Sequence, residues 1–190
     1  LSSLFFEIFD AVVCHLDLLF QHRDTLGEVV MRPHFAGQLF PLGFGHGRKN
    51  VKFGKLVGSD EALDKAIADA LADAGISAGE IDAVCGFANG CKRIDDIEKG
   101  ALKRVFGEKL ASMPLFEVKE RTGEGRAGSA ALAAAEAALL LSGELAGDNA
   151  YFVAADGSVA SKKVDAAGLK KMLVISFAAG GSYSAVVFGK

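Results

Sequence analysis

An alanine-rich stretch between Ala127 and Ala138 limits the folds open to this chain more than any other feature of its sequence. Eight of these twelve residues are alanine, and Glu136 is the one charged residue among them. Alanine has the highest helix propensity, and a helix that faces water normally carries charge along one side. The stretch therefore predicts a helix from about Gly125 to Leu141 that is buried and closely packed against other backbones.

Strand and helix patterns alternate around this helix. Helices are predicted at about 60–74 and 95–106, and strands at 38–45, 81–87, 113–118, 149–155, 171–179 and 182–189. Pro41 favours an edge position for the first strand, and Gly180 and Gly181 favour a tight turn between the last two. Alternating elements that end in an antiparallel pair are typical of an α/β layered domain with a mixed sheet.

The first 37 residues have a different pattern. Leu4, Phe5, Ile8, Val12, Leu16 and Leu19 follow helical spacing. Glu7, Asp10 and Asp17 interrupt them, and such charges are costly at bilayer depth, so the segment is not expected to span a membrane. It also lacks the basic front and small-residue cleavage site of a signal peptide. We interpret it as an amphipathic helix packed on a core or a partner.

Composition excludes several classes of protein. Hydrophobic residues make up 51% of the 190 residues, which is too many for a disordered chain. The formal net charge is -3, which provides no basic field for nucleic acid. Three cysteines do not make a disulfide framework, so a reducing, cytoplasmic location is predicted.

Two glycine-containing segments suggest anion binding. Gly123, Gly125 and Gly128 spell G-x-G-x-x-G before the alanine-rich helix, as in dinucleotide-binding domains, and Glu144 follows about twenty residues on. Charged residues between the preceding strand and Gly123 weaken this interpretation, as does Glu124 inside the motif. Residues 43–50, GFGHGRKN, are predicted to be a loop, either a solvated turn or an anion site.

The cysteines and histidines show no metal-ligand spacing. Cys85 is interpreted as a small apolar residue inside a strand, and Cys91 as a loop residue whose thiol Lys92 and Arg93 could activate. The histidines fall in the first quarter of the chain and are expected to have surface or core roles: His15, His22, His34 and His46.

Four segments, in this order, carry a resemblance to a known family. They are ALADAGISAGEIDAV, DDIEKGALKRVFGE, the run from Lys119 to Ala130, and ISFAAGGSYSAVVF. Together they resemble the C-terminal half of the β-ketoacyl-acyl-carrier-protein synthases of the thiolase superfamily. The resemblance implies a thiolase-like α/β half with a five-stranded mixed sheet, helices on both faces and one buried helix. It divides the chain into an unmatched segment, 1–37, and a C-terminal domain, 38–190.

The resemblance also implies a chemistry, decarboxylative Claisen condensation with a cysteine nucleophile and two histidines. The nucleophile belongs to the N-terminal half of the family's fold. The histidine positions correspond to Phe87 and Glu124 in this sequence, while a lysine of the second motif is kept as Lys119. Ala133 replaces an acid of the following helix, although Glu136 lies one turn further. Phenylalanine cannot donate a hydrogen bond to a substrate oxygen, and a carboxylate would repel a developing oxyanion.

Five residues, lying within the segments that carry the resemblance or between the first two of them, are expected to bind substrate. These are Asn89, Cys91, Phe177, Gly180 and Gly181. No cofactor and no metal are predicted.

The leading hypothesis is a non-catalytic protein of fatty acid or polyketide biosynthesis, similar to chain-length-factor subunits. It would bind an acyl-carrier protein together with a ketosynthase-like partner or as a homodimer, and an isolated half should expose an apolar face. One alternative is an active 3-oxoacyl synthase or acyltransferase completed by a second chain, with Cys91 or Glu124 in new roles. A weaker alternative is a nucleotide-binding α/β module.

Overall fold

The computed structural model describes residues 40–48, 60–154, 156–178 and 180–190. The helix predicted within residues 1–37 lies outside this part of the chain. The described strands are β1 (Phe40–Arg48), β2 (Ala83–Cys85), β3 (Leu115–Phe116), β4 (Tyr151–Val153), β5 (Val159–Ser161), β6 (Lys171–Ala178) and β7 (Ser182–Gly189). The described helices are α2 (Asp60–Ala74), α3 (Lys92–Phe106), α4 (Lys119–Thr122) and α5 (Ser129–Ser142), with short 3-10 turns at 78–80, 107–112, 126–128 and 166–168.

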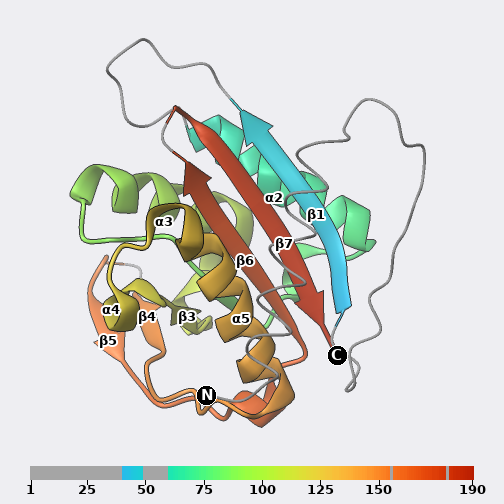
Figure 1. Ribbon diagram of the computed structural model, residues 1–190, viewed down its shortest axis with the longest axis vertical. Coiled ribbons are helices and arrows are strands. Elements are labelled where there is room, and N and C mark those ends of the chain that lie inside the picture. Colours follow the sequence, from blue (N-terminus) through green and yellow to red (C-terminus); the bar gives the residue numbers. More distant parts are fainter. Residues whose placement is uncertain (1–39, 49–59, 155, 179) are drawn as a thin grey trace.

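The described strands form one mixed sheet in the order β1-β7-β6-β2-β3-β4-β5 (Figure 1). β2 pairs in parallel with β3 and with β6. The remaining pairs are antiparallel, and β6 and β7 form the predicted hairpin, with Gly180 and Gly181 at positive φ in its turn. This confirms the mixed α/β architecture.

The number of strands corrects the expectation of five, because the described residues contain seven. β4 and β5 are three residues each and extend the sheet beyond β3 as a hairpin. β5 was missed because V-A-S has neither an apolar run nor alternation, and all three of its residues are exposed.

Side chains alternate between the two faces of the sheet, so each face has its own core. Along β6, Leu173 and Ile175 join the core under α2 and α3, while Met172 and Val174 join the core under α5. Figure 1 shows α5 crossing one face of the sheet and α2 lying against the other. Helices therefore cover both faces, as predicted.

The alanine-rich segment is the expected buried helix. Ten residues of α5 are buried, and Ala133, Ala134 and Ala137 pack with Leu140 and Leu141 in the core on its side of the sheet. The helix starts at Ser129, later than predicted, because a 3-10 turn occupies residues 126–128. It ends at Ser142, and the following Gly143 adopts the left-handed conformation that favours glycine at a helix C-terminus.

Strand β1 confirms the strand predicted at 38–45 and continues to Arg48, so residues 46–48 are not part of the loop predicted for residues 43–50. The glycines give this strand a flat face toward α2: a Cβ added to Gly43, Gly45 or Gly47 would lie within 2.3 Å of a backbone oxygen of α2. These oxygens belong to Ala70, Ala66 and Ala62, residues spaced four apart along one face of the helix. The glycines therefore serve close packing between a strand and a helix rather than anion binding.

Little large apolar surface is exposed in the described residues. Leu42 and Val159 are the large hydrophobic side chains that are exposed among the described residues. No described helix combines the length and the apolar character needed to cross a membrane.

Candidate functional site

Phe87 lies two residues after the end of β2, at the carboxyl end of this strand and of its parallel neighbours β3 and β6. Its side chain is 3% exposed and packs against Phe177 of β6 and Tyr183 of β7. The three ring centroids lie 5.7 to 6.1 Å apart with tilted planes, an arrangement favourable for aromatic rings. The position therefore contributes an apolar contact and no hydrogen-bonding side chain.

The backbone of Phe87 is held on both sides by charged residues. Its N–H donates to Oε1 of Glu98 at 2.7 Å, and its carbonyl oxygen accepts from Nζ of Lys119 at 2.9 Å. Glu98 lies on α3 and Lys119 begins α4, so two separate elements fix this one residue.

Glu98 is a buried carboxyl group, 2% exposed. Burial raises its pKa to about 8, against hydrogen bonds from the Phe87 and Ala88 amides that favour the ionised form. Gly86 makes room for it, because a Cβ there would lie 2.3 Å from Oε1 of Glu98. Glu98 was not among the predicted site residues, although its spacing of four from Ile94 and from Leu102 places it on the buried face of α3.

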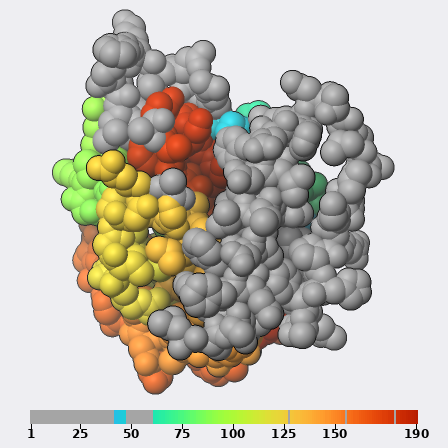
Figure 2. Space-filling model, in the orientation of Figure 1, coloured from blue at the N-terminus to red at the C-terminus, as the bar shows by residue number. Residues whose placement is uncertain are grey.

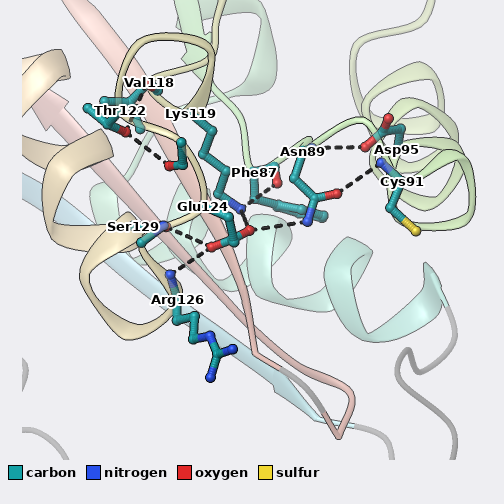
Figure 3. A network of polar contacts seen from close by, with 12 residues as sticks. Phe87, Asn89, Cys91, Asp95, Val118, Lys119, Thr122, Glu124, Arg126 and Ser129 are labelled. Carbon is teal, nitrogen blue, oxygen red and sulfur yellow. Dashed lines mark hydrogen bonds and ion pairs between the residues drawn. The ribbon is translucent and has the colours of Figure 1, made fainter.

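Glu124 is the centre of a network of polar contacts (Figure 3). One carboxylate oxygen, Oε2, accepts from Nζ of Lys119 at 2.9 Å and from Nδ2 of Asn89 at 3.1 Å. The other, Oε1, accepts from Oγ of Ser129 at 2.9 Å and from the N–H of Arg126 at 2.8 Å. Partial burial opposes ionisation, but these donors outweigh it and lower the pKa of Glu124 to about 2.

The loop between β2 and α3 uses its amide groups internally. The Asn89 N–H donates to Oδ1 of Asp95 at 3.1 Å, and the Cys91 N–H donates to Oδ1 of Asn89 at 3.1 Å. With the Phe87 and Ala88 amides directed to Glu98, four N–H groups of this loop point to side chains of the protein. They are therefore already engaged and do not form an oxyanion hole in this conformation.

The structure brings together some of the predicted site residues and not others. Phe87 contacts Phe177, and Asn89 joins Lys119 at Glu124. Cys91 is an exposed free thiol just before α3. Gly180 and Gly181 form the turn that joins the strands carrying Phe177 and Tyr183.

Three further residues complete the site, and the sequence analysis did not identify them. Tyr183 closes the aromatic cluster, while Ser129 and the amide of Arg126 bind Glu124. Ser129 is the first residue of the alanine-rich helix. Serine is favoured at helix N-termini, so the sequence could have marked this residue as the start of the helix. Figure 2 shows the yellow segment around α4 and the start of α5 at the surface of the molecule.

The structure does not support a dinucleotide site at Gly123. Helix α4 separates this glycine from β3, whereas a dinucleotide motif needs the strand to run directly into it. Glu124 occupies the turn with its ionised carboxylate. A separate cavity of about 470 Å³ lies at the other end of α5, lined by residues 143, 145–147 and 163–167, and none of the predicted site residues lines it.

The remaining cysteine and histidine predictions can be placed only in part. Cys85 is buried in β2 and packs in the core under α5, as the apolar interpretation predicted. His46 lies within β1. His15, His22 and His34 lie outside the described residues.

Comparisons with known proteins point to β-ketoacyl synthases. Residues 45–150 match the family model for the C-terminal domain of β-ketoacyl synthases. No curated protein gave a significant sequence match.

Three solved structures illustrate the likeness. The oxazolomycin ketosynthase domain OzmH KS8 from Streptomyces albus JA3453 is 20% identical with a TM-score of 0.67, over 80% of this chain and 44% of that one. The ketosynthase ApeO in complex with its chain length factor ApeC, from Xenorhabdus doucetiae, is 23% identical with a TM-score of 0.62, over 80% and 39%. The ishigamide ketosynthase/chain length factor is 21% identical with a TM-score of 0.63, over 80% and 38%.

These likenesses show a thiolase-like mixed α/β fold. The chain spans roughly two fifths of the length of the structures it matches. The family model covers more than half of the chain, from β1 to the residue before β4. The chain therefore belongs to the β-ketoacyl synthase family, through that family's C-terminal domain.

Proposed function

We propose that this chain is a non-catalytic β-ketoacyl-synthase-like protein that assists a competent ketosynthase in fatty acid or polyketide assembly. Its role would resemble that of a chain length factor, which is the partner named for ApeO. In this proposal Phe87 and Glu124 occupy the two positions at which the family uses histidine.

The state of these two residues is the observation that supports the proposal. Phe87 offers a substrate only a buried ring, and the loop amides around it donate to Glu98, Asp95 and Asn89. Glu124 is an ionised carboxylate with four donors, and a carboxyl with a pKa of about 2 is a weak general base near neutral pH. Removal of one oxyanion donor typically costs about 10²–10³ in rate, so the loss of both histidines would leave little catalysis.

We further propose that the thiolase-like domain extends over residues 38–190 and that residues 1–37 form a separate helical segment. An acyl-carrier protein is the proposed third component, since one of the matched structures is a type II ketosynthase in complex with its acyl-carrier protein. We also propose a cytoplasmic location, because three cysteines in 190 residues do not make a disulfide framework.

The first experiment tests catalysis. The full chain is incubated with acyl- and malonyl-thioesters, and its intact mass and the free thiol released are followed, with an active ketosynthase as positive control. We expect no adduct and no turnover. An adduct on the chain that disappears in Cys91→Ser would instead support the active acyltransferase.

The second experiment tests partnership. The chain is co-expressed with the ketosynthase encoded nearest to its own gene and with the cognate acyl-carrier protein. We expect co-purification with the ketosynthase and a change in product chain length when this chain is left out. Product lengths that are identical with and without the chain would contradict the proposed role.

A further inference from the structure

A second polar cluster lies inside the molecule, away from Glu124. Glu136, in the middle of α5, is 3% exposed, and its Oε1 forms an ion pair with Arg121 of α4. Asn149, just before β4, donates from Nδ2 to the same oxygen at 3.4 Å. The cluster therefore joins α4, α5 and the beginning of the β4–β5 hairpin.

Two oxygens of this cluster are buried and have no hydrogen-bond partner among the described residues. They are Oε2 of Glu136 and Oδ1 of Asn149. Buried polar oxygens are nearly always hydrogen-bonded in folded proteins, because an unsatisfied one loses its hydration without compensation. Two such atoms in one cluster point to a ligand that satisfies both.

The chemistry of the two atoms defines that ligand. Both are acceptors, so the ligand must donate two hydrogen bonds. Exchanging the oxygen and nitrogen of the Asn149 amide does not satisfy these atoms. It would place Oδ1 against Oε1 of Glu136 and remove the hydrogen bond at 3.4 Å. Arg121 already balances the charge of Glu136, so a neutral donor fits better than a cation.

We propose that one ordered water molecule binds between Glu136 and Asn149, donating to Oε2 of the first and to Oδ1 of the second. Buried waters of this kind are a fixed part of a protein structure, because they supply hydrogen bonds to polar atoms that have no partner in the protein. The proposed water would add a second link between the edge hairpin and the buried helix, beside the direct bond from Asn149 to Oε1 of Glu136. The inference stands apart from the proposed function, because it involves neither Phe87 nor Glu124.

The test uses NMR on the isotope-labelled full chain. We expect a cross-peak between water and the Asn149 side-chain amide, with the sign of a water that stays bound for longer than a nanosecond. The cross-peak should be lost in Glu136→Leu, which fills the space with carbon, and kept in Glu144→Leu, an exposed acid just beyond α5. Absence of the cross-peak in the wild-type chain overturns the proposal, whether or not the variants fold.

A crystal structure that resolves ordered water separates water from a monovalent cation. We expect one peak with no anomalous signal from crystals soaked in rubidium, at hydrogen-bond distance from both orphan oxygens. A rubidium peak at this position, or density that brings Oε2 of Glu136 and Oδ1 of Asn149 within hydrogen-bond distance of each other, overturns the proposal.

Discussion

Asn89 and Glu124 lie 35 residues apart in the sequence, and Nδ2 of Asn89 donates to Oε2 of Glu124 at 3.1 Å. The bond joins the loop after β2 to the segment before α5. Lys119 strengthens the junction, since its ammonium group contacts both Glu124 and the carbonyl of Phe87. The loop after β2 and the segment before α5 are therefore linked by a polar bridge.

This bridge predicts an acid-dependent contribution to stability. The native pKa of Glu124, about 2, lies below the ordinary 4.5, so its contribution is present above about pH 4.5 and is lost as pH falls toward 2. We expect Glu124→Gln to be less stable than the wild type near neutral pH and to approach it as the pH is lowered to about 3. Urea midpoints across this range measure the difference. Glu144→Gln, an exposed acid outside the network, is the control, and a gap that stays constant with pH would contradict the prediction.

Glu98 predicts the opposite pH dependence. Its pKa is raised by burial from 4.5 to about 8, so the native state holds a proton that the unfolded chain has released. Stability is therefore expected to fall as pH rises from about 4.5 to 8 and to level off above that window. Glu98→Gln, which cannot ionise, should remove this slope, while the exposed Glu108→Gln should keep it. Urea unfolding at several pH values measures this dependence of the unfolding free energy on pH. The same dependence in Glu98→Gln as in the wild type would show that another group is responsible.

The aromatic cluster predicts that Phe87 contributes to stability. Phe87→Ala removes a buried ring that packs on Phe177 and Tyr183, and about 3–5 kcal/mol of unfolding free energy should be lost. Phe87→Leu keeps most of the apolar volume and should cost less than about 1.5 kcal/mol. Urea denaturation measures both, and near-ultraviolet circular dichroism reports the ring environment. Equal stability of the two variants would mean that the packing does not depend on the ring.

The contact between β1 and α2 predicts that alanine is not tolerated at Gly45. A Cβ there would lie 1.9 Å from the carbonyl oxygen of Ala66, so strand and helix must separate. Gly45→Ala should destabilise the chain by about 2–3 kcal/mol. Gly79→Ala is the matched control, because its Cβ would meet nothing closer than Oγ of Ser77 at 3.6 Å. A loss at Gly45 no larger than at Gly79 would refute the close packing.

The elements found from the sequence are those whose pattern is local. The alanine-rich run predicted α5, and the apolar runs around Val84 and Leu173 predicted buried strands, because burial on both faces leaves a continuous apolar signature. β5 left no such signature, since its residues face solvent. The end of β1 was misplaced, because glycine marks both turns and close backbone approach, and residues 46–48 were assigned to a loop.

The candidate site was predictable only at the residues that carry the family pattern. Phe87, Lys119 and Glu124 were found by their place in that pattern, and the structure brings them together. Glu98, Ser129 and Tyr183 come from other elements, and only the folded chain shows that they face the same region. Spacing within a helix or strand says which residues share a face, but not which faces meet.

The glycine face of β1 and the alanine face of α2 also have a consequence for protein engineering. The two faces are complementary in shape. The strand has no side chains at Gly43, Gly45 and Gly47, and backbone oxygens of the helix occupy the space where those side chains would lie. A chimera that borrows the strand from a relative with bulkier residues would need the relative's helix as well. The strand β1 and the helix α2 are thus one interchangeable unit.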